Sequence, residues 1–484
     1  MFSGTIDTIM IQAILPEILL LTLAMLILIF DIFLPEKYHG NLGWITAVGL
    51  ALIIGICLIF ARPGEEPVLV WGGMLRFDWL GFVFAIMFLF AASITSLVSM
   101  DLTELGRRGE YYLLMLASTM GMCLMAASAD LIMLYLAIET TSIPLYILSG
   151  FLVRDNKSTE SGFKYLLFGA MTSAIMLFGF SLLYGFTGTT NIYEMAQAVQ
   201  TGQIPLILLF GSMLLVLVGF AFKISVVPLH FWAPDVYEGA PTPIAGFLST
   251  ASKAAGFAVL VRFLLAVYPA LTPEWSVFIA VLSTVTMTVG NLLALAQKNI
   301  KRMLAYSSIA HAGYILIGLV AVSELGMTSV VFYLVAYIFT NLAAFAVVAA
   351  YGRIVGSDEI SSYAGMSRRN PWLALALMIA LLSLSGMPPF AGFVVKFAVF
   401  AAAVQAGMVW LAVVGVLNSI IGLYYYLTVL KVVYLYRSEN DDQALPVTRA
   451  YKLALGILSL SIIVLGVLFG PLFALSSAAA ASIF

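Results

Sequence analysis

The chain has 484 residues, of which 63% are hydrophobic and only 10% are charged, and its formal net charge is −2. A soluble protein carries about 25% charged residues and about 45–50% apolar ones, so this composition excludes a soluble globular domain. The near-balance of charge gives no indication of a nucleic-acid partner, and none is expected. The sequence therefore predicts an all-α polytopic membrane protein embedded in a lipid bilayer.

Apolar segments long enough to cross a bilayer recur along the whole chain. The first follows the stretch MFSGTIDTIM, which has no lysine or arginine. A secretory signal begins with a basic region, so we expect this segment to remain as a membrane helix. Because a span needs about 20 apolar residues, the pattern predicts about fourteen spans. They lie near residues 11–34, 43–61, 77–99, 112–128, 130–151, 163–186, 204–233, 242–268, 276–296, 303–322, 327–351, 372–404, 407–431 and 453–475.

Basic residues outside the spans are divided unevenly between the two sets of alternating loops. One set holds only Arg62 and Arg76. The other set holds Lys37, Arg107, Arg108, Arg154, Lys157, Lys164, Lys298, Lys301, Arg302, Arg353, Arg368, Arg369, Lys431, Arg437, Arg449 and Lys452. Cytoplasmic loops carry an excess of lysine and arginine, so the second set is predicted to face the cytoplasm and both termini the outer side. A missed or invented span would scramble this alternation.

Two of the predicted spans, the seventh and the twelfth, are too long and contain helix breakers. One helix over residues 204–233 would measure about 45 Å, against a hydrocarbon core of about 30 Å. Proline removes a backbone donor and clashes with the preceding turn. Interrupted backbone survives in a membrane only where it is buried in protein or lines a wet cavity. The predicted breaks are Pro228 in the seventh span and Gly386, Pro388 and Pro389 in the twelfth.

The two breaks lie five spans apart, which indicates an internal repeat. A unit of five spans crosses the membrane an odd number of times, so its second copy must be inverted, as in many transporters. The sequence similarity between the copies is weak, and the repeat is inferred from the breaks. We predict a three-helix N-terminal segment over residues 1–109, repeats over 110–268 (spans 4–8) and 274–431 (spans 9–13), and a cytoplasmic loop with a C-terminal helix over 432–484.

Ionisable residues lie well inside four of the predicted spans. They are Glu139 in the fifth span, Lys223 beside the break of the seventh, Lys253 midway along the eighth and Lys396 in the second half of the twelfth. A charge at the centre of a bilayer costs about 2.5–3.5 kcal/mol on insertion scales. One carboxylate cannot neutralise three amines, so the lysines are candidate proton donors and acceptors. The alternative, that each is a satisfied polar group stabilising helix packing, is less favoured for all four together.

Other polar residues in the spans are weaker candidates. His311, in the tenth span, is a candidate proton relay through its two ring nitrogens, or a group bonded to a serine of the preceding turn, Ser307 or Ser308. His230 follows Pro228 and is predicted either to lie in a polar cavity or to cap loose backbone. Packing or snorkelling explains the charged residues nearer the span ends, which are Glu17, Asp31, Asp78 and Arg262.

No cofactor or metal site is expected in this chain. Cys57 and Cys123 are too few for an iron–sulfur cluster or a structural zinc, which need about four ligands, and are predicted to be small core residues. Neither G-x-G-x-x-G after a strand nor G-x-x-x-x-G-K-[ST] is present. Any redox or nucleotide chemistry is therefore expected in other chains.

Several stretches resemble the antiporter-like membrane subunits of proton-pumping NADH:quinone oxidoreductase (respiratory complex I). These are PLHFWAPDVYEGAPTPIAGFLSTASK (228–253), QKNIKRMLAYSSIAHAGYILIGL (297–319), SGMPPFAGFVVKF (385–397) and GLYYYL (422–427). The resemblance extends over roughly residues 110–430. The DVYEGAP wording and the lysine in the eighth span look like the N-type branch, called subunit 2 in mitochondria. The wider family includes subunits of multi-subunit sodium/proton antiporters.

The resemblance implies inverted five-helix repeats that each form a proton half-channel along a central polar axis. The family's functional residues fall on Glu139, Lys223, Lys253 and Lys396. The resemblance also implies that the chain belongs to an enzyme complex. In that complex, partner subunits pass electrons from NADH, or ferredoxin, through flavin and iron–sulfur clusters to quinone. The expected partners are an adjacent antiporter-like subunit and small membrane subunits. The expected location is a bacterial cytoplasmic (inner) membrane, with a thylakoid or mitochondrial inner membrane as the alternative.

These observations combine into one hypothesis for the path of the proton. Pro228 breaks the helix so that Lys223 faces a hydrated cavity, where Glu139 pairs with it. The proton then passes through Lys253, by way of His311 and bound water, to Lys396 and an exit. Two alternatives are a sodium/proton antiporter subunit without redox partners, and a passive membrane subunit whose buried charges only lock the helices together.

Overall fold

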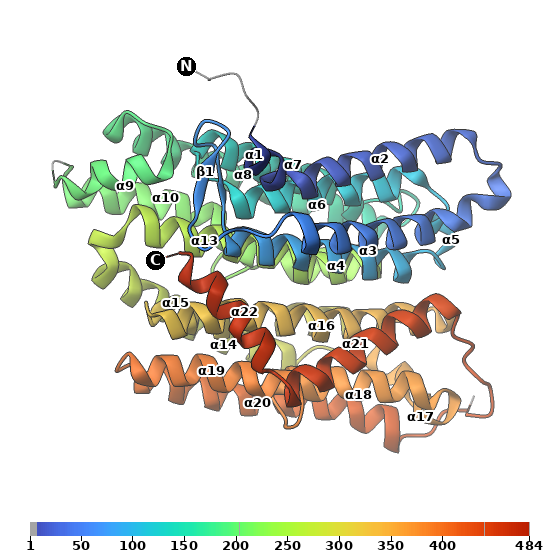
Figure 1. Cartoon of the computed structure of the whole chain (residues 1–484). Coiled ribbons are helices and arrows are strands. Elements are labelled where there is room, and N and C mark those ends of the chain that lie inside the picture. The colour runs from blue at the N-terminus through green and yellow to red at the C-terminus, as the bar shows by residue number, and fades with distance from the viewer. Residues whose placement is uncertain (1–6, 203, 440, 484) are drawn as a thin grey trace.

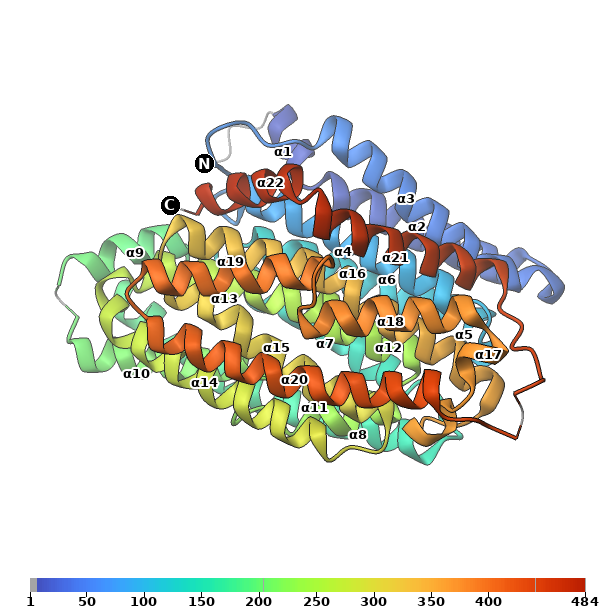
Figure 2. The ribbon, with the colours of Figure 1, turned by 90° about the horizontal axis from the view of Figure 1, so that it is seen from below.

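The computed structural model describes residues 7–202, 204–439 and 441–483, and nearly all of them are helical. The helices lie side by side along one common direction (Figures 1 and 2). Within these residues, 13 helices are long and apolar enough to cross a membrane. The predicted twelfth span is a pair of shorter apolar helices, Pro371–Ser385 and Ala391–Gln405. The predicted all-α membrane fold is therefore confirmed, with the predicted number of crossings.

The N-terminal segment consists of three long helices and a short hairpin that the sequence did not predict. Its elements are α1 (Thr8–Ala13), α2 (Leu15–Phe33), the 3-10 helix η1 (Glu36–Asn41), α3 (Leu42–Phe60), β1 (Val68–Val70), β2 (Leu75–Phe77), α4 (Trp79–Ser99) and α5 (Thr103–Gly106). β1 and β2 pair antiparallel, with Val68 opposite Phe77. Asp78 then begins α4 by accepting a hydrogen bond of 2.8 Å from the Gly81 backbone N–H, a favoured N-cap arrangement.

The first predicted repeat follows, and its helices include one π-helical stretch and a short helix, α9, that was not predicted. The elements are α6 (Gly109–Ala127), α7 (Leu131–Ser149), α8 (Asn156–Thr187), α9 (Ile192–Gln200), α10 (Leu206–Ile224), α11 (Trp232–Gly239), α12 (Thr242–Phe247), the π-helix η2 (Leu248–Ser252) and α13 (Lys253–Val267). The seventh span is thus α10, and α11 continues the chain beyond the break.

The second predicted repeat and the C-terminal segment complete the chain. The elements are η3 (Pro269–Leu271), α14 (Thr272–Leu295), α15 (Ile300–Val320), α16 (Glu324–Val355), η4 (Ile360–Tyr363), α17 (Met366–Arg369), α18 (Pro371–Ser385), α19 (Ala391–Gln405), α20 (Val409–Leu435), α21 (Arg449–Val467) and α22 (Gly470–Ala481). The last predicted span, 453–475, is too long, because α21 ends at Val467. Pro471 lies in the first turn of the separate helix α22, where its missing N–H is not needed.

Both predicted breaks are present in the structure. α10 ends at Ser225, which has a φ of +59°, and α18 ends at Gly386, which has a φ of +88°. The left-handed conformation ends a helix, and the prolines that follow prevent it from resuming in the same line. Lys223 and Lys396, the candidate site lysines of the two broken spans, lie on different sides of their breaks. Lys223 is in the last turn of α10, whereas Lys396 lies in α19, after the break.

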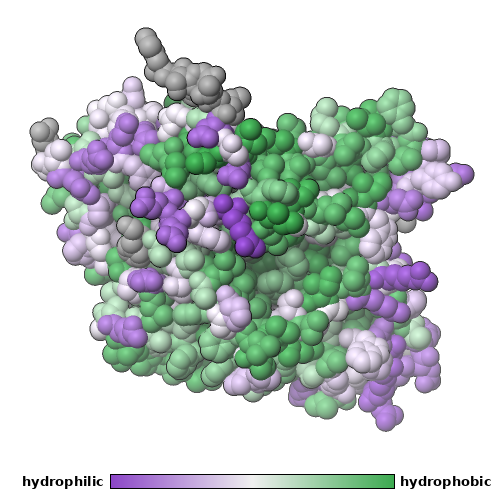
Figure 3. All heavy atoms as spheres, viewed as in Figure 1, coloured by the Kyte–Doolittle hydropathy of each residue, from purple (hydrophilic) through white to green (hydrophobic). Residues whose placement is uncertain are grey.

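The N-terminal and C-terminal halves form two layers, with α2–α13 in one and α14–α22 in the other (Figure 1). α9 lies at one end of the bundle, α5 and α17 lie at the opposite end, and the terminal helices α1 and α22 lie nearer to the α9 end (Figures 1 and 2). Hydrophilic residues gather towards these ends, with hydrophobic surface between them (Figure 3). Leu52 and Phe397 are 63% and 66% exposed, as suits contact with lipid or a neighbouring subunit.

Of the charged residues near span ends, Asp78 and Arg262 form a buried ion pair. The two guanidinium nitrogens of Arg262 donate to the two carboxylate oxygens of Asp78 at 2.7 and 2.9 Å. Arg262 also donates to the Ala126 carbonyl at 2.9 Å. This bidentate geometry is strong, and it fastens α13 to the start of α4. The packing interpretation of these two residues therefore agrees with the structure.

Candidate proton-conducting site

The predicted lysines of the site are all buried in the protein. Lys223, Lys253 and Lys396 are 6%, 1% and 5% exposed, whereas Glu139 is partly exposed. Each lysine is next to irregular backbone. Lys223 precedes the break after α10, Lys253 follows the π-helix η2, and Lys396 lies beyond the break after α18. Irregular backbone inside a membrane protein is typical of functional positions.

Glu139 and Lys223 lie on either side of one small cavity without contacting each other. The Lys223 ammonium donates a hydrogen bond to the Ser142 hydroxyl of α7, and the Ser173 hydroxyl of α8 donates to Glu139. No ion pair within 4 Å joins the lysine and the glutamate in the described part of the chain. The cavity they share is about 10 Å³, roughly the room that one water needs. The predicted direct pair is therefore replaced by two serine contacts.

Lys253 reaches across from α13 to α15. Its ammonium donates to the Ser308 carbonyl at 2.8 Å and also to the Ser308 hydroxyl. One turn further along α13, Gly256 lies against Lys223 of α10. A Cβ built on Gly256 would lie 3.1 Å from the Lys223 Cβ and 2.8 Å from the Ile224 side chain. Only glycine allows the two helices this close approach.

Lys396 lies in a pocket formed by the break in the twelfth span. Its ammonium donates to the Ser385 carbonyl at 3.0 Å and to the Ser419 hydroxyl of α20 at 2.7 Å. It also lies 4.8 Å from the centre of the Tyr314 ring, within range of a cation–π attraction. The backbone of Gly386 faces the lysine directly. A serine hydroxyl, a carbonyl and a ring face, rather than a carboxylate, thus hold the charge.

His311 is hydrogen-bonded to tyrosines, so the serine contact, one of the two alternatives for this residue, is not formed. Its Nδ1 lies 2.8 Å from the Tyr333 hydroxyl and its Nε2 3.3 Å from the Tyr426 hydroxyl. Tyr426 in turn is hydrogen-bonded to Ser307. Ser307 and Ser308 are not hydrogen-bonded to His311, because its ring extends away from α15 towards α16 and α20, where the two tyrosines lie.

One helix, α15, connects the lysines of the two predicted repeats. Ser308, His311 and Tyr314 follow one another at intervals of three residues, so each lies one turn from the next, and the row winds about 120° around the helix from Ser308 to Tyr314. Ser308 contacts Lys253 at one end of this row, and the Tyr314 ring contacts Lys396 at the other. The structure therefore connects Lys253 and Lys396 through α15, whereas the sequence showed only that they lie on separate spans.

The break after α10 holds several buried polar atoms without a protein partner. They are the Ser225 hydroxyl, the Nδ1 of His230 and the Tyr237 hydroxyl. Buried polar groups are normally bonded to protein or to ordered water. Both predicted placements of His230, in a polar cavity or as a cap on loose backbone, therefore stay predictions.

A cluster of charged residues lies on α11, beyond the same break. Asp235 accepts from Lys164 at 2.6 Å and from Arg302 at 2.8 Å, while Glu238 accepts from Lys157 at 2.8 Å and from Arg302 at 2.9 Å. Burial alone raises the pKa of the Asp235 carboxyl, but Lys164 and Arg302 outweigh it and hold that pKa below its usual value. Burial also raises the pKa of the Glu238 carboxyl, but Lys157 and Arg302 outweigh it and hold that pKa below its usual value. The cluster joins α8, α11 and α15, and so both predicted repeats.

The contacts of the site include serines that sequence reasoning missed or assigned to another partner. Ser142 lies one turn after Glu139, so helical spacing could have indicated it. Ser308 was considered as a partner of His311, and its contact with Lys253 was not predicted. No local signal could have found Ser173 or Ser419, because they come from helices far along the chain. In the described residues, no group of three or more His, Cys, Asp or Glu side chains is placed to hold a metal ion.

Residues 128–422, which include all the predicted site residues, match the NADH:quinone oxidoreductase/Mrp antiporter transmembrane family. The chain belongs to this family. The NADH-quinone oxidoreductase subunit N of Trichlorobacter lovleyi is 42% identical over 466 residues, covering 96% of this chain and 95% of that protein. The predicted resemblance is confirmed.

Solved structures show the same fold. A chain of respiratory complex I from Thermus thermophilus superposes with a TM-score of 0.80 at 33% identity, covering 96% of this chain and 99% of that one. A chain of the Mrp complex from Dietzia sp. has a TM-score of 0.82 at 21% identity, covering 99% and 98%. The second likeness shows a shared fold alone.

Proposed function

We propose that this chain is a proton-translocating membrane subunit of an NADH:quinone oxidoreductase, and that Glu139, Lys223, Lys253 and Lys396 carry the proton. The observation that carries the proposal is the row on α15, in which Ser308 contacts Lys253 and Tyr314, two turns further along the helix, contacts Lys396. Buried amines aligned across a bundle, in a chain 42% identical to a named subunit N, fit proton transfer better than helix packing.

The chemistry follows from the partners of the lysines. Lys223, Lys253 and Lys396 each donate to a serine hydroxyl, respectively Ser142, Ser308 and Ser419. A hydroxyl both accepts and donates, so it can bond an ammonium and, after rotating, a neutral amine. A carboxylate accepts only, and would hold the lysine in its charged form. The serines therefore let each lysine gain or lose a proton without repacking the helices.

Glu139 is proposed to control the first lysine. A carboxylate that approaches Lys223 favours the charged amine, and its withdrawal favours release of the proton. In the present arrangement Ser173 bonds Glu139 and Ser142 bonds Lys223. A water in the small cavity between them would connect the two groups. In this arrangement Glu139 and Lys223 are separated, and a rotation of either side chain would form a direct ion pair between them.

The proton would then move along α15. From Lys253 it would pass through Ser308 to the hydroxyl network of Ser307, Tyr426 and His311, and onwards to Lys396. His311 suits a relay because its two nitrogens contact hydroxyls of two different helices, α16 and α20. His230, with its unpartnered Nδ1, would contact water at the first break.

Two inverted five-helix repeats, each a proton half-channel, remain part of the proposal. Support comes from the starts of α7 and α15, the predicted fifth and tenth spans. Asp130 forms an antiparallel bridge with Asn191, and Asn299 forms one with Glu359. Asn191 precedes α9 and Glu359 precedes η4, which leads to α17. Because α9 and α17 lie at opposite ends of the bundle (Figure 2), the same arrangement recurs upside down.

The energy would come from partner subunits that pass electrons from NADH, or ferredoxin, through flavin and iron–sulfur clusters to quinone. An adjacent antiporter-like subunit and small membrane subunits would cover part of the exposed apolar surface. We place the chain in a bacterial inner membrane with both termini on the outer side. The position of the terminal helices α1 and α22 towards α9 (Figure 1) and the excess of basic residues in the loops predicted to lie on the other side support this orientation.

The test is Lys223→Ala in membrane vesicles that contain the intact complex, with Lys298→Ala as the control. Lys298 is an exposed lysine in a loop. We expect Lys223→Ala to abolish NADH-driven proton uptake in a complex that still assembles, and Lys298→Ala to pump normally. Unchanged pumping per electron in Lys223→Ala would contradict the proposal and favour a passive structural subunit. Proton movement driven by a sodium gradient without NADH would favour a sodium/proton antiporter.

A further inference from the structure

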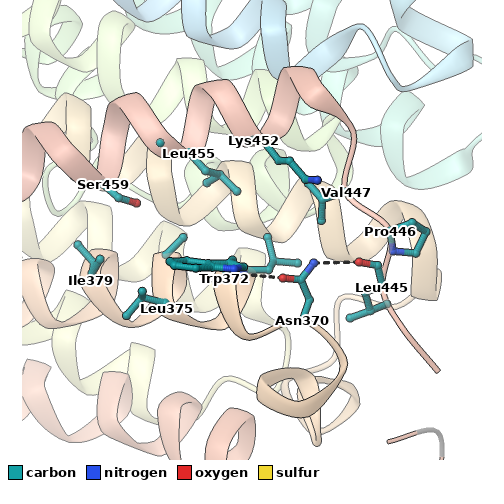
Figure 4. A pocket seen from close by; sticks show the side chains of 13 residues that line it. Asn370, Trp372, Leu375, Ile379, Leu445, Pro446, Val447, Lys452, Leu455 and Ser459 are labelled. Atoms are coloured by element: carbon teal, nitrogen blue, oxygen red, sulfur yellow. Dashed lines mark hydrogen bonds between the residues drawn. The ribbon is translucent and has the colours of Figure 1, made fainter. Parts of the chain in front are cut away.

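A groove runs between α18 and α21, away from the row of lysines. Its volume is about 720 Å³, within the roughly 300–1,000 Å³ of typical small-molecule sites. Leu375 and Ile379 of α18 form one wall, and Leu455 and Ser459 of α21 extend towards them from the other (Figure 4). Trp372 also lines the groove and is 80% exposed. The lining is therefore mainly aliphatic and aromatic.

The groove lies at membrane depth. α21 is one of the helices that can span a bilayer, and α18 is the first half of the broken twelfth span. Water does not fill an aliphatic groove that faces hydrocarbon. Whatever occupies it must come from the membrane, either as lipid or as a helix of a neighbouring chain.

One end of the groove is basic. α18 and α21 both begin there, so their positive dipole ends lie at the same side. Lys452 lines this end, and Arg449 precedes it by one turn of α21. Both side chains are exposed, and neither has an ion-pair partner in the described part of the chain. The basic end belongs to the loops predicted to face the cytoplasm.

The neutral polar group at this end is already used by the protein. The Asn370 amide donates to the Leu445 carbonyl at 2.9 Å, and its oxygen accepts from the Leu373 N–H at 3.0 Å (Figure 4). These bonds hold the segment before α21 against the start of α18, and so shape the opening. The charged group in the lining that is left to bind a ligand head is the Lys452 ammonium, with Arg449 one turn before it on α21, and these cations select a negative charge.

We propose that this groove binds an anionic glycerophospholipid of the cytoplasmic leaflet. An acyl chain lies between Leu375, Ile379 and Leu455, and the phosphate lies at Lys452 and Arg449. Trp372, a residue type enriched at membrane interfaces, lies beside the glycerol region. A zwitterionic lipid such as phosphatidylcholine would fill the aliphatic part equally well, but the cation of its head group offsets the charge of its phosphate. The charge complementarity therefore favours a lipid with a net negative charge.

The test compares variants of the intact complex, purified and placed in phosphatidylcholine nanodiscs to which phosphatidylglycerol is added. Bound lipid is counted by native mass spectrometry. Gly456→Leu should fill the groove, since a Cβ at Gly456 meets no heavy atom within 4 Å. Gly55→Leu in α3 is the matched control, because Gly55 is equally open and lies away from the groove. Lys452→Gln removes one charge and leaves the aliphatic walls intact.

We expect the unmodified complex to retain phosphatidylglycerol in preference to phosphatidylcholine. Gly456→Leu should lose this lipid, Lys452→Gln should bind it about fivefold more weakly, and Gly55→Leu should match the unmodified complex. Equal retention in Gly456→Leu and the unmodified complex would overturn the proposal, as would equal retention of the two lipids. Cross-linking of Ser459→Cys to a neighbouring subunit would also overturn it, since a protein helix would then occupy the groove.

Discussion

Replacing Gly386 by alanine should uncouple the complex by displacing Lys396. Gly386 ends α18 with a φ of +88° and faces the lysine side chain. An added Cβ would lie 2.9 Å from the Lys396 Cδ and 3.5 Å from its Nζ. Carbon atoms pack at about 3.5–4.0 Å, so the lysine must move by roughly 0.6–1.1 Å.

That displacement is enough to break the contacts of the lysine. Its hydrogen bond to the Ser419 hydroxyl is 2.7 Å, and a shift of this size takes it to about 3.3 Å or beyond, near or past the limit of a hydrogen bond. A misplacement of about 1 Å costs on the order of 10²-fold in a reaction that depends on geometry. We therefore expect proton pumping to fall by about that factor.

The backbone cost of the substitution needs its own control. A non-glycine residue in the left-handed region costs about 1–2 kcal/mol. Gly407, between α19 and α20, has a φ of +78°, and a Cβ there meets no heavy atom within 4 Å. Gly407→Ala therefore introduces the same strain without touching a lysine.

The assay measures proton pumping per NADH oxidised in membrane vesicles, together with the thermal stability of the purified complex. Both variants should lower the melting temperature by similar amounts, and only Gly386→Ala should lose pumping. If the two variants pump equally well, contact between Gly386 and Lys396 does not matter for the proton path, and the reasoning is refuted.

Two further predictions concern the contacts on either side of α15. Ser308→Ala leaves Lys253 only the carbonyl acceptor at 2.8 Å, and losing a hydrogen bond to a charged group costs about 1.5–3 kcal/mol. Pumping should slow by about tenfold or more, which stopped-flow measurements with a pH dye would detect, whereas Ser308→Thr should restore it. Lys164 and Arg302 hold the pKa of the Asp235 carboxyl below its usual value. The ion pairs of Asp235 therefore stabilise the fold fully above about pH 3.9, the pKa of an aspartate in the unfolded chain. This stabilisation is lost as the pH falls through the lower pKa of Asp235 in the folded protein. Asp235→Asn should lower the melting temperature at pH 7, and the melting temperature of the variant should fall less between pH 7 and pH 3 than that of the unmodified protein. Identical melting curves of the variant and the unmodified protein across this pH range would contradict the prediction.

Features that depend on a short stretch of chain could be predicted from the sequence. The spans follow from runs of apolar residues, the breaks from Pro228 and from Gly386 with its prolines, and the buried lysines from charges inside those runs. Each of these rests on the cost of moving a peptide group or a charge into hydrocarbon, which a single segment already determines. The short helix α9 and the β1–β2 hairpin escaped prediction because neither crosses the membrane.

What each charge contacts was decided by the tertiary structure. The sequence suggested that Glu139 would pair with Lys223, yet Ser173 and Ser142 separate them, and Ser173 comes from a different span. For His311 the sequence left open a proton relay or a bond to a serine of its own helix, and the side chain contacts tyrosines of two other helices. A buried polar group bonds whichever partner packing brings within about 3 Å, and that depends on which helices lie side by side. The sequence therefore determined which charges enter the membrane, and only the folded bundle determined the hydroxyl groups to which they are hydrogen-bonded.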